Sequence, residues 1–327
     1  MKDANFLYYL LAFALTFLIT VILERRLIPI LKATAAQPIY TEGPDWHMKK
    51  SGTPTMGGIG FLISCAVSLI LAASYLLFKG ESYFALSLII SLCYAMMNSF
   101  IGIIDDRAKI RKKENAGLSP IEKLMLQAIA ATMFLLARNI LLGDGTTVYF
   151  STGTLDLGML YYPIALLMLL GTVNCANLTD GVDGIASGVA FAIGLSLAYL
   201  SLNSNSEVEF ISFAIMGAAI AFLIFNIHPA KIFMGDTGSL LFGSLIAAAC
   251  FSLGNMLIIL VVGIIYVIEG LSVVLQVAAF KMTGKRIFRM APFHHHLEKC
   301  GWSENKIVIW AIIVTVLLSA FADFLFL

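Results

Sequence analysis

The stretch FLYYLLAFALTFLITVILERRLI, residues 6–28, decides the class of fold. No charged side chain interrupts it before Glu24. An α-helix of about 20 apolar residues is long enough to cross the hydrocarbon core of a bilayer. The run is too long for the core of a signal peptide, and no small-residue cleavage site follows it. We therefore interpret it as a retained membrane span.

The rest of the chain has the same character. Of its 327 residues, 60% are hydrophobic and 13% are charged, whereas soluble domains are about 45–50% apolar and about 25% charged. Ten apolar runs are candidate spans: residues 6–28, 57–78, 83–104, 121–142, 161–175, 185–202, 210–227, 239–253, 257–280 and 307–325. The sequence thus predicts an all-α integral membrane protein with ten transmembrane helices, forming one transmembrane catalytic domain over residues 1–327. We expect the short fifth and eighth runs to end below the membrane surface and to line a cavity.

The basic residues predict the orientation. If both termini are outside, all but three of the 21 Lys and Arg residues fall in the inner gaps, the exceptions being Lys2, Lys79 and Arg138. This bias follows the positive-inside rule, so we expect both termini to be extracytoplasmic and the polar motifs to share the cytoplasmic face. The net charge of +1 gives no electrostatic support for nucleic acid binding.

An outer gap and the cysteines carry smaller signals. In TTVYFSTGTLDLG, residues 146–158, apolar residues alternate on both sides of a Ser-Thr-Gly-Thr centre, which predicts a small extracytoplasmic β-hairpin. The five cysteines form no CxxC pair, so we expect free thiols, four of them inside or beside apolar runs.

The pair Asp105-Asp106 closes the third run. We expect it at a helix C-terminus, where the helix dipole disfavours anions. The pair then needs cations, which Lys109, Lys112, Lys113 or a divalent metal can supply. The alternative is a solvated helix end that only terminates the span.

Two further acidic motifs follow. NCANLTDGVDGIASG, residues 174–188, places Asn177, Asp180 and Asp183 among glycines that allow tight turns and close approach to a ligand. In FNIHPAKIFMGDTGSLLFG, residues 225–243, Asp236 directly precedes the eighth run, where helix amides suit phosphate and carboxylate oxygens suit Mg²⁺. Simple helix capping by Asp183 and Asp236 is the alternative for both motifs.

Two other features are candidates on weaker grounds. The run KKSGTPTMGGIGF, which begins at Lys49, is a basic, glycine-rich entry to the second span. Glu269 and Gln276 lie inside the ninth apolar run, and an intramembrane ionisable residue is a functional candidate. A structural hydrogen bond is the alternative for Glu269.

The loop APFHHHLEKCGW, residues 291–302, holds three of the five histidines. Imidazole donates and accepts hydrogen bonds when neutral and binds phosphate when protonated. The alternatives are a solvated loop and a zinc site built from the histidines and Cys300.

Taken together, PTMGG, GIIDD, NLTDGVDG, FMGDTGSL and APFHHHLEKCGW resemble, in order and spacing, the motifs of the phospho-N-acetylmuramoyl-pentapeptide transferases. These belong to the polyprenyl-phosphate N-acetylhexosamine-1-phosphate transferase superfamily. The acidic motifs are shared across the superfamily, whereas the unbroken histidine triplet is specific to the muramoyl-pentapeptide branch. Arg107 is a local departure, because the family usually has an aromatic residue there.

The resemblance implies a ten-helix protein, usually a homodimer, with a cytoplasmic cleft. Its reaction would be Mg²⁺-dependent transfer of phospho-MurNAc-pentapeptide from UDP-MurNAc-pentapeptide to undecaprenyl phosphate, which gives lipid I and UMP. This is the first membrane step of peptidoglycan synthesis in the bacterial cell membrane.

The same resemblance implies roles for individual residues. Asp236 would bind Mg²⁺, Asp105 would be the base for the lipid phosphate, and Asp106 would be essential. The uracil pocket would include Phe233, Asp183 and the Gly181-Val182 backbone. The other nucleotide and pyrophosphate contacts would be Asn177, Asp180, Asn226, Lys50, Gln276, His294, His295 and His296, and the lipid phosphate would meet Lys109 and Lys123.

Other functions remain open at this level. A transferase that uses UDP-N-acetylglucosamine is a close alternative, although that branch usually has a split histidine motif. A secondary transporter or channel is compatible with ten spans, but transporters often show a repeated half and none is evident here. The sequence does not distinguish direct attack from a two-step route through an aspartyl-phosphate.

Overall fold

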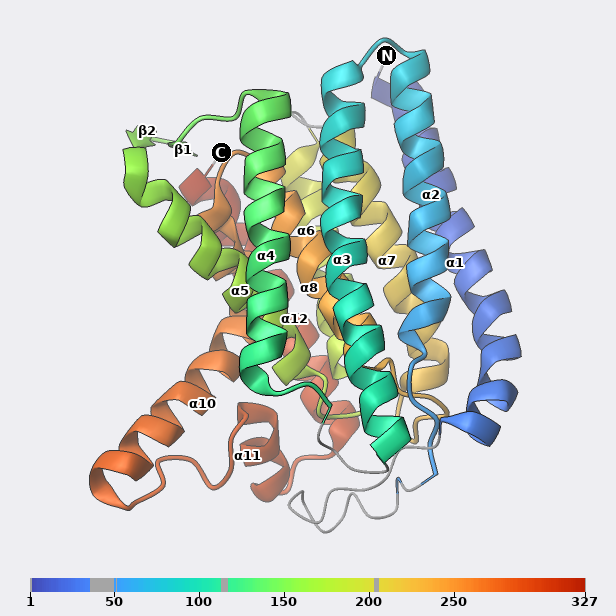
Figure 1. Ribbon diagram of the computed structural model, residues 1–327, viewed down its shortest axis with the longest axis vertical. Coiled ribbons are helices and arrows are strands. Elements are labelled where there is room, and N and C mark those ends of the chain that lie inside the picture. Colours follow the sequence, from blue (N-terminus) through green and yellow to red (C-terminus); the bar gives the residue numbers. More distant parts are fainter. Residues whose placement is uncertain (1, 36–49, 51, 113–116, 203–205, 327) are drawn as a thin grey trace.

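The structure is a computed structural model that describes residues 2–35, 50, 52–112, 117–202 and 206–326. Lys49 and Lys113 lie outside the described residues, as does the side chain of Lys112. The described chain forms a helical bundle whose N- and C-terminal ends lie at the same end of the molecule (Figure 1). This placement agrees with an even number of crossings.

The bundle is built almost entirely of helices. They are α1 (Lys2–Thr34), α2 (Gly58–Phe78), α3 (Ser82–Lys112), α4 (Pro120–Ala137), α5 (Tyr161–Thr179), α6 (Ile185–Ser201), α7 (Ser206–Asn226), α8 (Gly235–Ser252), α9 (Ile259–Val262), α10 (Ile264–Thr283), α11 (Phe293–Lys299) and α12 (Glu304–Phe326). Shorter elements are η2 (Arg138–Leu142), η3 (Gly158–Leu160), η4 (Met256–Ile258) and the strands β1 (Thr147–Phe150) and β2 (Gly153–Asp156).

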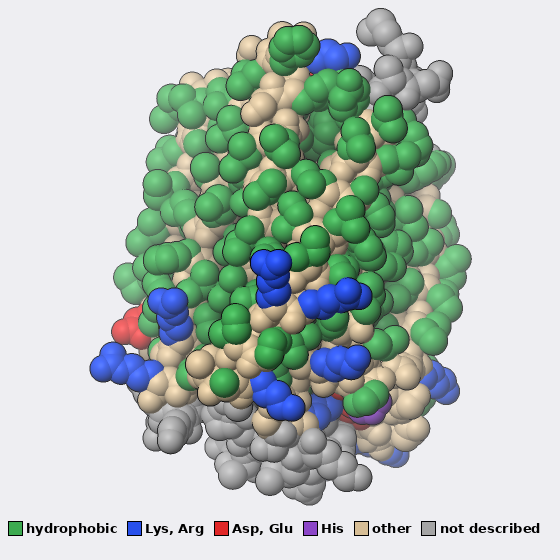
Figure 2. Space-filling view, turned by 90° about the vertical axis from the view of Figure 1, so that its right-hand side faces the viewer, with side chains coloured by type: hydrophobic (Ala, Val, Ile, Leu, Met, Phe, Trp, Pro, Cys, Tyr) green, Lys and Arg blue, Asp and Glu red, His purple; other side chains and the backbone are tan. Residues whose placement is uncertain are grey.

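The predicted class of fold is confirmed. Within the described residues, nine helices are long and apolar enough to cross a membrane, and α6 is a shorter apolar helix at the sixth predicted span. Hydrophobic side chains cover most of the face beside α1 and α2, and Lys and Arg gather toward the end away from the chain termini (Figure 2). The chain is therefore a multi-pass membrane protein.

The predicted boundaries were wrong where polar motifs meet the spans. The fifth and eighth runs do not stop at Cys175 and start at Ser239, because α5 continues to Thr179 and α8 already begins at Gly235. Likewise α3 continues to Lys112, so the Asp pair lies inside a helix and not at its end. The ninth run is not one helix either, since Gly263 separates α9 from α10.

The predicted hairpin is confirmed. Strands β1 and β2 are antiparallel, with Val148 paired to Leu155 and Phe150 to Gly153. The Asn255 side chain donates a hydrogen bond to the Tyr149 carbonyl at 2.6 Å and so attaches the hairpin to the segment after α8. The hairpin lies at the same end as the chain termini (Figure 1).

Helix α8 is the centre of the bundle and positions the site. Of the residues in α8, 89% are buried. The helix packs on α3, α5 and α7. Glycines permit this packing: a Cβ on Gly58 of α2 would collide with the Gly238 backbone, and one on Gly102 of α3 would collide with the Asp236 carbonyl. The first turn of α8 is thereby held against α3 one turn before the Asp pair.

Helix α10 has a different environment. It extends away from the bundle (Figure 1), and its outer residues Val274 and Phe280 are exposed. Its inner face is nevertheless buried at Glu269 and Ser272, close to α11. The projecting helix thus connects the lipid-facing side of the molecule to the histidine segment.

Candidate active site

Asp106 fixes the beginning of α8. Its Oδ1 accepts a hydrogen bond from Asp236 N at 3.0 Å, and its Oδ2 accepts from Thr237 N at 3.0 Å and Thr237 Oγ1 at 2.7 Å. A buried carboxylate is thus satisfied by the first amides of a helix, where the dipole favours an anion. The amides that we expected to bind phosphate are therefore occupied by Asp106.

Asp105 and Asp236 lie beside two lysines in this cluster. Lys109 Nζ lies 2.6 Å from Asp105 Oδ2 and 3.1 Å from Asp236 Oδ2, while Lys123 Nζ lies 2.5 Å from the same Asp236 oxygen. The backbone amide of Leu118 donates to Asp105 Oδ1 at 2.7 Å. Lys109 is therefore a cation partner of the Asp pair, as predicted, whereas Lys123 from α4 pairs with Asp236.

Asn177, at the end of α5, completes the cluster. Its Nδ2 donates to Asp236 Oδ1 at 3.0 Å and to Ser239 Oγ at 2.8 Å, and its Oδ1 accepts from Lys123 Nζ at 3.1 Å. Three motifs separated in sequence thus meet at one point. We call this group, Asp105, Asp106, Asp236, Lys109, Lys123 and Asn177, the acid–lysine centre.

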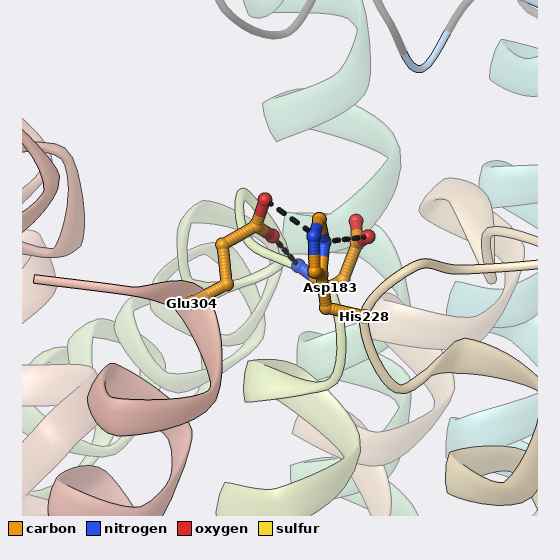
Figure 3. Close-up of side chains that lie close together, drawn as sticks. All are labelled: Asp183, His228 and Glu304. Atoms are coloured by element: carbon orange, nitrogen blue, oxygen red, sulfur yellow. Dashed lines mark hydrogen bonds and ion pairs between the residues drawn. The ribbon is translucent and has the colours of Figure 1, made fainter.

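A second cluster surrounds Asp183, in the loop between α5 and α6 (Figure 3). Lys50 Nζ lies 2.7 Å from Asp183 Oδ1 and 2.7 Å from Glu304 Oε2. His228 Nδ1 lies 3.0 Å from Asp183 Oδ2 and 3.2 Å from Glu304 Oε1. Glu304 also accepts from the backbone amide of Asp183 at 2.8 Å. We call these four residues the loop clamp.

The loop clamp contains residues that the sequence analysis missed. His228 stood in a quoted motif without a role, and Glu304, in the first turn of α12, belonged to no motif. Only the short polar gap before the last span could have drawn attention to Glu304. Asp183 is not the helix cap considered above, because the N-cap of α6 is Gly184 and it has no side-chain cap bond.

Further bonds join the loop before α6 to the loop before α8. Asn226 accepts from Gly184 N at 3.0 Å and donates to the Ile232 carbonyl at 2.9 Å. Phe233 is held through its backbone, which bonds to Pro54 and Gly57 of the glycine-rich entry to α2. Val182 is buried. Asn226 therefore joins the two loops through its side chain.

The three histidines have three different surroundings. His294 is buried, with Nδ1 3.1 Å from Glu269 Oε2. His295 Nδ1 lies 2.6 Å from Glu298 Oε2. His296 Nδ1 accepts from Arg289 N at 3.2 Å, and its ring stacks on Phe293. The structure therefore distinguishes the three histidines by their partners, whereas the sequence offered no basis for assigning them different roles.

Two predicted binding residues lie outside these clusters. Gln276 of α10 makes three hydrogen bonds to the backbone of Ile287 and Phe288, so it orders the loop before the histidines. Asp180 caps the end of α5. Burial, followed by the charges of Asp236 and Asp106, raises the pKa of Asp180 well above its usual range.

The acid–lysine centre has the donor atoms for a divalent cation. Carboxylate oxygens of Asp105, Asp106 and Asp236 lie within 4.8 Å of one another. Such hard oxygen donors suit Mg²⁺. Because Asp106 is committed to the amides of α8, Asp105 and Asp236 are the carboxylates left to hold an ion. In both clusters a lysine ammonium lies between two carboxylates: Lys109 between Asp105 and Asp236, and Lys50 between Asp183 and Glu304.

The comparisons with known proteins match this architecture. The model of glycosyl transferase family 4 matches residues 87–254, which include the acid–lysine centre, and signature 1 of the phospho-N-acetylmuramoyl-pentapeptide-transferases matches residues 50–62. The fold and the site thus define a membrane-embedded member of glycosyl transferase family 4.

Curated relatives identify the family within this class. Phospho-N-acetylmuramoyl-pentapeptide-transferase of Halalkalibacterium halodurans is 41% identical over 319 residues, which are 97% of each chain. The proteins of that name from Geobacillus thermodenitrificans and Clostridium perfringens are 43% and 40% identical over more than nine tenths of each chain. The chain belongs to the phospho-N-acetylmuramoyl-pentapeptide-transferase family.

Proposed function

We propose that the protein transfers phospho-MurNAc-pentapeptide from UDP-MurNAc-pentapeptide to undecaprenyl phosphate. An oxygen of the lipid phosphate attacks the phosphorus that carries the sugar, the bond to UMP breaks, and lipid I and UMP are formed. The observation that carries the proposal is the acid–lysine centre, where Lys123 Nζ and Lys109 Nζ lie 2.5 and 3.1 Å from one oxygen of Asp236. Two ammonium groups beside a pair of carboxylates suit a reaction between two anionic phosphates.

We assign the roles of the residues from the hydrogen bonds and ion pairs that each side chain already makes. Asp105 Oδ2 lies 2.6 Å from Lys109 Nζ and receives no bond from the start of α8, so Asp105 is the group we assign to take a proton from the lipid phosphate. Lys109 and Lys123 bind phosphate oxygens once these displace the carboxylates. Asp183, Phe233 and the Gly181-Val182 backbone hold the uracil, with Lys50 and Asn226 fixing their positions.

Mg²⁺ fits the proposal, because carboxylate oxygens are hard donors and those of Asp236 and Asp105, unlike those of Asp106, are not bound to the amides at the start of α8. When bound, the ion supplies charge neutralisation to the phosphates and the departing UMP. The residues themselves orient the reactants: Asn177 keeps Asp236 facing the lysines through its 3.0 Å hydrogen bond. In-line positioning of this kind accounts for much of the acceleration in phosphoryl transfer.

We also propose the setting of the reaction. The acceptor is confined to the membrane and the donor is soluble, so a centre made of helix ends is a place where both can meet. The charge bias supports a cytoplasmic position for this centre and an outer position for both termini. We expect a homodimer, as is usual in the family.

Turnover in detergent tests the proposal. Purified protein is given UDP-MurNAc-pentapeptide, undecaprenyl phosphate and Mg²⁺, and lipid I and UMP are measured. Absence of both products rejects the function. Competition with UDP-N-acetylglucosamine tests the donor, since preference for that sugar nucleotide would place the chain in the neighbouring branch.

A further inference from the structure

Glu269 and His294 form a buried pair beside the active site. Glu269 of α10 is 1% exposed and His294 of α11 is 1% exposed. His294 Nδ1 lies 3.1 Å from Glu269 Oε2, and the His294 backbone amide donates to both carboxylate oxygens at 3.2 Å. An intramembrane carboxylate is thus held by two groups of a single histidine.

This contact determines where the ring carries its proton. A carboxylate only accepts hydrogen bonds, so Nδ1 must carry the hydrogen that it donates to Glu269. In the neutral ring, Nε2 then has a free lone pair. No hydrogen-bond partner for His294 Nε2 is found among the residues that the structure describes, although the atom is buried.

The free nitrogen faces the loop before α6. A Cβ on Gly181 would collide with His294 Nε2, so the absence of a side chain there leaves the nitrogen room to lie against the loop. The Gly181 amide cannot satisfy this nitrogen, because it donates to the Thr179 carbonyl at 2.9 Å. A buried acceptor without a partner is costly in free energy unless a ligand supplies a donor.

The neighbouring histidines differ in this respect. His295 has a carboxylate at Nδ1 but is less buried, at 13% side-chain exposure, and faces Glu298 of its own helix. In His296, Nδ1 accepts from Arg289 N, so the hydrogen is on Nε2, which lies 3.7 Å from Cys300 Sγ. Within the described chain, His294 is the member of the triplet whose buried nitrogen is left over for a ligand.

We propose that Glu269 is a positioning residue that holds His294 in the Nδ1–H tautomer, so that Nε2 accepts a hydrogen bond from a hydroxyl or N–H group of the sugar nucleotide beside Gly181. The substrate contact rests on the proposed function, whereas the tautomer does not. A phosphate oxygen is not the partner of Nε2 in this tautomer, because both atoms are acceptors. His294 therefore recognises a neutral donor group, and the lysines serve the phosphates.

Nitrogen NMR of ¹⁵N-histidine-labelled protein in detergent tests the tautomer directly. Nitrogens that carry hydrogen and nitrogens that do not have well-separated shifts, and a His294→Asn variant assigns the signals. We expect His294 to show a protonated Nδ1 and a bare Nε2, and the Nε2 signal to move when UDP-MurNAc-pentapeptide is added. A wild-type spectrum with hydrogen on Nε2 would overturn the proposal without any variant having to fold.

Glu269→Gln tests the positioning. Glutamine has one acceptor oxygen for two donors, so we expect a mixture of tautomers at His294 and a loss of about tenfold in kcat/KM. Glu298→Gln is the matched control, since it alters the equivalent contact of His295 and should leave the His294 signals unchanged. Unaltered His294 signals in Glu269→Gln would also reject the role of Glu269.

The outcomes separate this inference from the proposed function. If the tautomer is found but no lipid I is formed, Glu269 positions His294 and the proposed reaction is wrong. If Glu269→Gln changes the tautomer and kcat/KM stays at the wild-type value, the reaction stands and the substrate contact of Nε2 is wrong.

Discussion

The acid–lysine centre and the loop clamp both combine carboxylates with lysine, yet they are built differently. The centre joins helices α3, α4, α5 and α8, and its Asp236 is shared by two lysines and an asparagine. The clamp joins loops and one helix start, and both oxygens of its Asp183 already have donors in Lys50, His228 and Ala230 N. We infer that Asp236 can exchange its lysine partners for a cation, whereas the donors on Asp183 fix the loop that we assign to the uracil.

The largest expected effect is at Asp236. Asp236→Asn removes the charge that Lys109 and Lys123 share and a ligand we assign to Mg²⁺, so turnover should fall by about 10³-fold or more. The measurement is lipid I formation in detergent, with the thermal midpoint Tm as the check on folding. Full activity would show that the centre is not where the chemistry occurs.

Asp106→Asn should distinguish a catalytic role of Asp106 from its structural role in holding the start of α8. An amide has one acceptor oxygen, so one of the donors from the start of α8 loses its partner, at a cost of about 1–3 kcal/mol. We expect both activity and Tm to fall, with a larger drop in Tm than for Asp236→Asn. An unchanged Tm together with lost activity would instead make Asp106 a direct participant.

Glu304→Gln addresses the loop clamp. Glutamine keeps one acceptor for Lys50 and the Asp183 amide and loses the charge, so the loop that we assign to uracil is held less firmly. We expect about a tenfold lower kcat/KM, because a charge-assisted bond contributes about 1.5–3 kcal/mol and part of it remains. The change should appear in KM for the sugar nucleotide. A fall confined to kcat would move Glu304 into the chemistry.

The smallest effect concerns Asp180. Its pKa is raised in the folded protein, chiefly by burial, so the stability it contributes is present below its unfolded pKa and is lost as pH rises through the folded value. At neutral pH, Asp180→Asn should therefore raise Tm by a few degrees, and the difference from wild type should vanish in acid. A variant that is less stable than wild type at neutral pH would contradict this sign.

Much of this arrangement could be predicted, because the motifs fall at the ends of apolar runs. The membrane class, the hairpin and the meeting of Asp105, Asn177 and Asp236 at one point followed from that pattern. Helix ends could not be predicted from hydropathy, since α3 runs past Asp105 with a Lys109 partner four residues on.

The contacts of the loop clamp and the histidines were beyond the sequence for another reason. Glu304 reaches Lys50 and Asp183 across 254 and 121 positions, and no local pattern records such a distance. The same holds for Glu269, which was a candidate by its depth but had no predicted partner. Residues that orient other side chains over long sequence distances produce no recognisable motif in the sequence.

The bonds from Asp106 to the first turn of α8 have an evolutionary consequence. Through these bonds, one carboxylate both stabilises the packing of α3 on α8 and fixes the orientation of Asp236. One turn earlier on α3, Gly102 leaves no room for a side chain. A substitution on α3 or α8 is therefore tolerated only if the contact between the two helices is kept. Resistance to an inhibitor of this centre should therefore arise more readily in the surrounding loops than along this helix pair.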